Sequence, residues 1–155
     1  MDTATARKSA LDFLKSHKTG VLSTASLEGQ PHASAVYYMC DDDFNIYFVT
    51  LITSRKFAAI KANPKVAFVV GRQDVPQTVQ LEGTAEEITY NEEKSQRVAD
   101  LVEILTSNSA YYPPIAQLDR SEIVVVWVKP LWLRWADYAA FKSGTSEVCT
   151  EIPLQ

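Results

Sequence analysis

The strongest constraint on this fold is a series of β-type runs joined by connections too short for a crossover. Residues 20–25, 31–39 and 46–50 are rich in small, β-branched and aromatic residues, and each run predicts a strand. A glycine-containing turn at residues 27–30 and an acidic turn at residues 40–45 separate them. Because parallel neighbours need a crossover of a dozen or more residues, these strands are expected to pair antiparallel.

Further strands are predicted later in the chain. Residues 65–71 form an apolar run, and residues 78–89 form a longer one in which apolar and polar side chains alternate, so that one face meets water. Gly83 inside the longer run indicates a bulge or a tight bend of the kind that lets a sheet curl. Residues 123–128 predict a core strand that breaks at Pro130 and resumes through residues 131–138.

Three helices are predicted around these strands. Near the N-terminus, one helical face carries Ala6, Ala10, Phe13, Leu14 and His17, and Gly20 follows as the expected C-terminal cap. Ser54 is placed to cap a short helix at residues 54–62. A third helix is expected at residues 91–105, and an irregular loop at residues 106–120.

Together the elements predict a mainly β fold with peripheral helices, an antiparallel barrel of about six strands. The length of 155 residues fits one domain, which is assigned to residues 1–138, with a C-terminal tail at residues 139–155.

Composition restricts the environment and the partners. The chain is 46% hydrophobic and 22% charged, which excludes disorder as the overall state. Its longest apolar run, residues 123–128, is far too short to span a bilayer, and no secretory signal precedes residue 18. Two cysteines make no disulfide framework, so a cytoplasmic location is expected. A net charge of −4 argues against nucleic acid as the main partner.

The clearest chemical signal is carried by Ser54, Arg55 and Lys56. Two cations in the first turn of a predicted helix oppose the helix dipole, and no acid in that turn offsets them. Free backbone N–H groups, a serine hydroxyl, a guanidinium and an ammonium together would make a phosphate site. The pattern alone fits a pair of solvated surface charges equally well.

Five sequence blocks occur in a fixed order. They are residues 29–38, 46–50, 54–56 (Ser-Arg-Lys), 63–66 (Asn-Pro-Lys-Val) and 79–85 (Val-Gln-Leu-Glu-Gly-Thr-Ala). The ordered set resembles the pyridoxamine 5′-phosphate oxidase-like family of FMN-binding split barrels, from about residue 20 to residue 88 and more loosely through Trp135. The resemblance implies a six-stranded split barrel that forms a homodimer, with FMN bound in two grooves at the dimer interface.

The resemblance also assigns the cofactor contacts. The positions that hold the FMN phosphate are matched by Thr50, Ser54, Arg55 and Lys56. The strand that runs along the isoalloxazine and ribityl groups is matched by Ser34, Ala35, Val36 and Tyr37, where small side chains would allow close backbone approach. Trp135 lies near the place of an aromatic residue that contacts the flavin from the partner subunit. Trp127 is expected in the barrel core, and Arg134 either in a surface salt bridge or at the flavin's electron-rich edge.

Departures from the family pattern bear on activity. True pyridoxamine phosphate oxidases carry an arginine where this chain has Ser34, a lysine where it has Met39, and an Arg-x-His motif near the C-terminus, whereas no histidine follows His32 here. Oxidation of pyridoxamine phosphate is therefore not predicted. His17 and His32 lack the spacing of a metal site, so no metal is expected.

The hypothesis is therefore a small cytoplasmic oxidoreductase, a homodimer that uses FMN and a nicotinamide reductant, NADH or NADPH, on an unidentified acceptor. Neither nucleic acid nor a membrane is expected as a partner. One alternative is a flavin-binding or stress protein without turnover. The other is a deazaflavin-dependent reductase on the same fold, although an acidic chain with one basic cluster suits that cofactor's long anionic tail less well.

Overall fold

The strands and helices follow the order that the sequence predicts. The computed structural model describes residues 1–71, 74, 76–88, 96, 99–100, 103, 119–144 and 148–154. Its elements are, in chain order, α1 (Thr3–Ser16), β1 (Thr19–Ala25), β2 (Pro31–Cys40), β3 (Ile46–Leu51), α2 (Arg55–Ala62), β4 (Lys65–Gly71), β5 (Gln77–Glu87), a 3-10 turn (Arg120–Glu122), β6 (Ile123–Asp137), a second 3-10 helix (Tyr138–Ser143) and β7 (Cys149–Glu151).

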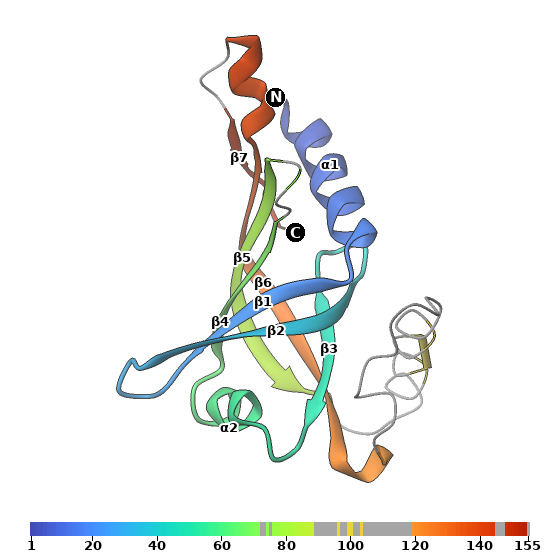
Figure 1. Ribbon diagram of the computed structural model, residues 1–155, viewed down its shortest axis with the longest axis vertical. Helices are drawn as coiled ribbons and strands as arrows, with labels where there is room; N and C mark the ends of the chain where they lie inside the picture. Colours follow the sequence, from blue (N-terminus) through green and yellow to red (C-terminus); the bar gives the residue numbers. More distant parts are fainter. Residues whose placement is uncertain are drawn as a thin grey trace.

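The sheet closes into a six-stranded antiparallel barrel, which confirms the predicted fold class. Its strands are hydrogen-bonded in the order β3-β2-β1-β4-β5-β6, and a further β3–β6 pairing completes the ring. The seventh strand, β7, adds to the free end of β6. The two helices α1 and α2 lie at opposite ends of the barrel (Figure 1). No helix among the described residues is both long and apolar enough to span a membrane.

The barrel is split between β2 and β3. These strands pair only where Tyr38, Met39 and Cys40 meet Phe48, Tyr47 and Ile46. The earlier part of β2 pairs with β1 alone, and the end of β3 pairs with β6 alone. If the β2–β3 register continued, Val36 would face Thr50, so the ladder opens at the residues that the sequence assigns to a cofactor.

Strand β6 differs from its prediction, because it passes through Pro130 without a break. The β5–β6 register shifts between Glu82 and Gly83, opposite Pro130. A Cβ atom on Gly83 would lie 2.2 Å from the carbonyl oxygen of Lys129, so only glycine fits this bulge. The bend predicted at Gly83 is confirmed, and the bulge accommodates a proline that cannot donate to the ladder.

Gly20 was predicted as a helix cap, and this prediction is wrong. Helix α1 ends at Ser16, and its cap residue His17 is extended, with φ of −109°. Gly20 lies within β1, where a Cβ atom would stand 2.3 Å from Cζ of Phe68. Glycine is required there because a ring fills the space, not because the backbone turns.

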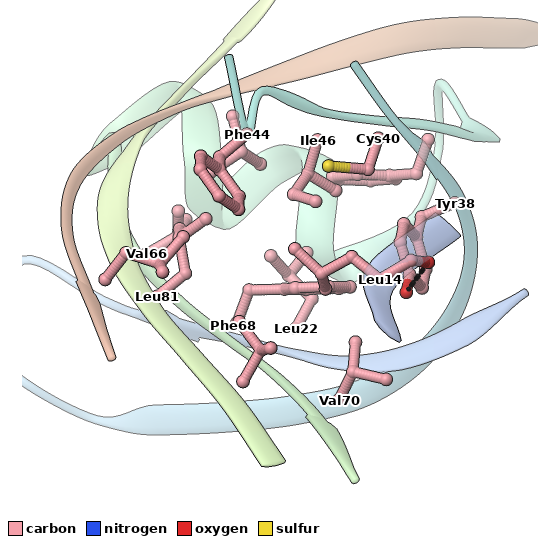
Figure 2. Close-up of a cluster of buried hydrophobic side chains, with 14 of the residues drawn as sticks. Leu14, Leu22, Tyr38, Cys40, Phe44, Ile46, Val66, Phe68, Val70 and Leu81 are labelled. Carbon is pink, nitrogen blue, oxygen red and sulfur yellow. Dashed lines mark hydrogen bonds between the residues drawn. The ribbon is translucent and has the colours of Figure 1, made fainter. Parts of the chain in front are cut away.

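The barrel interior forms one hydrophobic core (Figure 2). Helix α1 closes one end by burying Ala6, Ala10, Phe13 and Leu14. The Tyr38 hydroxyl donates a hydrogen bond of 2.7 Å to the carbonyl oxygen of Leu14, tying the helix to β2. Helix α2 buries only Phe57 and Ile60 at the other end.

The end of the chain returns to the barrel. Strand β7 pairs with residues 134–136 of β6, and Ile152 beyond it is 3% exposed within the core. The predicted helix at residues 91–105 falls mostly outside the described residues. Within this range the structure describes only Gln96, Ala99, Asp100 and Glu103, and all four are helical. The predicted loop at residues 106–120 lies outside them except for its last two residues.

Candidate cofactor-binding site

The N-terminus of α2 carries two cations, Arg55 and Lys56, that have no carboxylate partner among the described residues. Ser54 is the N-cap, and its Oγ accepts a hydrogen bond of 3.2 Å from the backbone N–H of Phe57. Arg55 and Lys56 follow as the first two helical residues, and the first turn holds no acid. Ion pairs join Lys8 to Asp12 and Lys15 to Asp42, whereas neither Arg55 nor Lys56 forms an ion pair with a described residue.

The connection from β3 holds this helix start in place. The backbone N–H of Ser54 donates to the carbonyl oxygen of Leu51 over 3.0 Å, which closes a tight turn. The N–H of Ile52 donates to the carbonyl oxygen of Glu122 over 2.9 Å, which ties the turn to the start of β6. The position of Ser54, Arg55 and Lys56 is therefore set by the barrel itself.

Thr50 lies directly behind the helix cap. It is 4% exposed, near the end of β3, and its Oγ1 is 3.0 Å from the Oγ of Ser54. The phosphate-site residues predicted from the sequence, Thr50, Ser54, Arg55 and Lys56, are thus brought together at one end of the barrel.

The four candidates on β2 alternate between the two faces of the strand. Val36 points into the barrel and is buried, and Ser34 shares its face, because alternate residues of a strand share one side. Ala35 is exposed and Tyr37 is half-buried on the outer face. A ligand on the outer face would therefore meet the side chains of Ala35 and Tyr37, and only the backbone of Ser34 and Val36.

These residues suit a flavin nucleotide such as FMN. The Oγ of Ser34 is buried without a hydrogen-bond partner, beside a part of β2 that has no β3 neighbour. Buried polar atoms are rarely left unpaired, so this inward-facing hydroxyl is available to water, whereas a ligand on the outer face meets only the backbone of Ser34. The unneutralised cations at α2 complement a phosphate, and the small outward side chain of Ala35 permits close approach of a flat ring.

Trp135 lies apart from this group. It is 3% exposed, packs edge-on against Phe13 of α1 with ring centroids 5.3 Å apart, and pairs in register with Val79. With Phe13, His17 and Asp137 it lines a groove of about 450 Å³ between α1 and the ends of β5 and β6. In this chain Trp135 therefore belongs to the α1 end of the barrel, while the cations belong to the α2 end.

The expectation that Trp127 lies in the barrel core is wrong. Trp127 is half-buried outside the barrel interior, where it packs in a second cluster with Tyr47 and donates to Oδ1 of Asn45 over 2.9 Å. The Arg134 guanidinium forms no salt bridge among the described residues and donates instead to Oε1 of Gln80. Gln80 and Arg134 are cross-strand partners, a pairing that only the β5–β6 register defines.

Cys40 is not an activated nucleophile. Burial, with a smaller contribution from the neighbouring Asp41 carboxylate, raises the pKa of its thiol to about 12. Burial is the larger of these two causes.

A six-stranded antiparallel barrel that opens beside a cationic helix start defines a protein of the split-barrel class. Residues 6–134 match the family model for pyridoxamine 5′-phosphate oxidase, and the chain belongs to this family. No curated protein is similar enough to match the chain.

Solved structures share the fold over most of their length. A conserved hypothetical protein from Mycobacterium tuberculosis is 26% identical, with a TM-score of 0.70 over 92% of this chain and 88% of that one. An FAD-binding protein from Mesorhizobium loti is 19% identical, with a TM-score of 0.65 over 81% of this chain and 90% of that one. A protein named F420 reductase is 24% identical, with a TM-score of 0.62 over 79% of this chain and 93% of that one.

Proposed function

We propose that this protein is a small FMN-dependent oxidoreductase. The observation that carries the proposal is the unneutralised pair Arg55 and Lys56, held next to the Ser54 cap at the open side of the barrel. Two cations at a helix N-terminus interact unfavourably with the helix dipole, and a bound phosphate would offset this electrostatic repulsion.

Each residue of the site has a role in this proposal. Ser54, Arg55 and Lys56 bind the FMN phosphate, and Ala35 and Tyr37 support the ring on the outer face of β2. Similarity in fold to proteins named FAD-binding and F420 reductase supports a flavin-like ligand.

When bound, FMN would supply the chemistry for electron transfer from a nicotinamide cofactor to a small acceptor. The residues of this chain bind and orient it, and no protein nucleophile is required. Ser34 and Met39 replace the basic residues expected of a true pyridoxamine phosphate oxidase, so pyridoxamine phosphate is not the proposed substrate.

The proposed assembly is a homodimer in the cytoplasm, and neither nucleic acid nor a membrane takes part. Exposed apolar side chains on the outer barrel surface, Val21 and Leu131 among them, suit an interface. Light scattering is expected to give about twice the chain mass of 17.3 kDa. A monomer at micromolar concentration contradicts the shared groove.

The visible spectrum of the purified protein tests the cofactor, and anaerobic addition of NADH or NADPH tests the reaction. Flavin absorption that either nucleotide bleaches supports an FMN oxidoreductase. A yellow protein that no nicotinamide reduces supports the alternative of a flavin-binding protein without turnover.

A deazaflavin reductase is the second candidate, favoured by the similarity to the F420 reductase structure. Competition between FMN and a deazaflavin cofactor for the apoprotein separates the two. Tighter binding of FMN supports the first proposal, and tighter binding of the deazaflavin replaces it.

A further inference from the structure

The side-chain hydroxyls of Thr50 and Ser54 at the cap of α2 are hydrogen-bonded to each other, and only one assignment of donor and acceptor satisfies both groups. Thr50 Oγ1 and Ser54 Oγ lie 3.0 Å apart, and Ser54 Oγ also accepts the N–H of Phe57. A hydroxyl has one hydrogen to donate and two lone pairs that accept. The direction of the Thr50–Ser54 bond therefore decides what Ser54 can still do.

Burial sets that direction. Thr50 is 4% exposed, and its only side-chain hydrogen bond within the described residues is the one to Ser54. If Ser54 donated to Thr50, the hydrogen of Thr50 would be buried without an acceptor, an arrangement that proteins avoid. If Thr50 donates to Ser54, its hydrogen is satisfied, and the half-buried Ser54 keeps its own hydrogen for an outside partner.

With Thr50 as donor, the oxygen of Ser54 is saturated. The N–H of Phe57 occupies one lone pair and the O–H of Thr50 occupies the other. Only the O–H of Ser54 remains, and the two existing bonds fix its direction. This O–H group lies at the start of α2, where the first backbone N–H groups also lack intrahelical acceptors. The cap therefore presents donors and cations together, which suits an acceptor-only anion.

We propose that Thr50 is a positioning residue, which holds the hydroxyl of Ser54 as a donor towards the phosphate of a flavin nucleotide. This inference rests on the proposed function, because the anion is the FMN phosphate. It changes the role expected from the sequence, where Thr50 was matched to a direct contact. Thr50 acts here through Ser54 and is itself covered.

The test compares FMN with riboflavin, which lacks the phosphate. Thr50→Val keeps the branched shape and removes the donor, so FMN affinity should fall about three- to tenfold, the size of one hydrogen bond, while riboflavin affinity stays unchanged. Thr50→Ser restores the hydroxyl and should restore FMN affinity. Thr50→Ala is measured in parallel, so that the test does not depend on one variant folding.

Thr24 provides the matched control. It is a threonine on a barrel strand, 3% exposed, and its Oγ1 has no hydrogen-bond partner. Thr24→Val makes the same chemical change without touching the cap of α2, and it should alter neither affinity. The ³¹P resonance of bound FMN gives an independent readout, expected to move in Thr50→Val and to stay in place in Thr24→Val.

The outcomes separate this inference from the proposed function. If Thr50→Val binds FMN like the parent while loss of Arg55 and Lys56 weakens binding, the positioning role is overturned and the phosphate site stands. If Thr50→Val loses FMN and riboflavin affinity equally, Thr50 serves only packing, and the inference is also overturned. If the parent binds FMN and riboflavin equally well, the phosphate site itself fails, and both ideas fail with it.

Discussion

The two helices of this barrel begin alike and differ in what their charges do. Helix α1 is capped by Asp2, whose Oδ1 accepts the N–H of Thr5 over 3.0 Å, and α2 is capped by Ser54. Neither helix has an acid in its first turn. Both also carry several cations, so that charge alone does not distinguish a structural helix from a binding one.

The cations of α1 have partners within the protein. Lys8 pairs with Asp12 at 2.5 Å, and Lys15 pairs with Asp42. The guanidinium of Arg7 lies 4.7 Å from the centre of the Phe44 ring. In α2, by contrast, Arg55 and Lys56 have no ion-pair partner among the described residues. We infer that the paired cations serve the fold and the unpaired ones serve a ligand.

The number of buried side chains also distinguishes the α1 end of the barrel from the α2 end. Helix α1 places four side chains in the core and receives a buried hydrogen bond from Tyr38. Helix α2 buries two side chains, and its cap retains a hydroxyl hydrogen for an outside partner. Stability should therefore depend most on the α1 end, and flavin affinity on the α2 end.

The largest expected effect is on stability, from Leu14→Ala at the α1 end. Leu14 is 0% exposed, and loss of its side chain leaves a cavity that should lower the free energy of unfolding by about 3–5 kcal/mol. Urea denaturation measures the change. FMN affinity, measured where the variant is fully folded, should stay within about twofold of the parent. A parallel loss of affinity contradicts the separation of the two ends.

The next effect is on affinity, from replacing Arg55 and Lys56 together by alanine. FMN affinity should fall at least a hundredfold, about 2.7 kcal/mol, because two charge-assisted contacts are lost. Riboflavin affinity should not change. The fold should be retained, since alanine favours helix and no longer opposes the dipole. Flavin fluorescence quenching measures both affinities.

Matched cations on α1 provide the control for this experiment. Lys8→Ala with Lys15→Ala also removes two positive charges from a capped helix, and so it changes the net charge equally. FMN affinity should be unaffected. If both double variants weaken FMN binding alike, long-range charge explains the effect, and the α2 cations hold no phosphate.

A smaller effect is expected from Tyr38→Phe, which removes one buried hydrogen bond at the α1 end. The carbonyl oxygen of Leu14 loses its tyrosine donor, and the free energy of unfolding should fall by about 1 kcal/mol. Thr24→Val provides the opposite case, because its hydroxyl is buried without a partner and its removal should cost nothing. Thermal unfolding of both variants measures the difference, and equal losses contradict the hydrogen-bond assignment.

The features predicted correctly from the sequence follow local rules. The cap at Ser54 needs only a serine before a helical run, and Gly29 lies in its predicted turn with φ of +85°. The bend at Gly83 follows from a glycine inside an alternating strand. The residues of the proposed phosphate site are also neighbours in sequence, apart from Thr50, which one short turn brings to Ser54, and their role in binding stays a prediction.

The features predicted wrongly depend on strand register and on packing between distant segments. Gly20 is required by the ring of Phe68, which lies on β4. Pro130 is accommodated by a bulge that its partner strand supplies, and Arg134 bonds to Gln80 across a strand pair. The contact of Trp135 with Phe13 of α1 likewise joins distant segments, and the predicted contact of Trp135 with a flavin stays a prediction. Hydrophobic periodicity does not define which residues of two strands lie opposite each other.

The smallest expected effect concerns the pH dependence of the Lys15–Asp42 pair. The hydrogen bond from Lys15 lowers the pKa of Asp42 below 3.8, and Asp42 raises the pKa of Lys15 above 10.5. The Asp42 contribution to stability is therefore present above pH 3.8 and lost as the pH falls through its folded pKa. The Lys15 contribution is present below pH 10.5 and lost as the pH rises through its own folded pKa.

Asp42→Asn should accordingly lower the melting temperature slightly at pH 7 and low salt, because both groups are charged there. The difference from the parent should shrink as the pH is lowered below 3.8, and it should shrink in high salt, since the pair is exposed. Lys56 at the other end has no carboxylate partner within the described part of the chain, so the effect of Lys56→Ala on melting should be the same at pH 7 and below pH 3.8. An effect of Lys56→Ala that fades in acid like that of Asp42→Asn would mean that α2 has a carboxylate partner after all, and the contrast between the two helices would be lost.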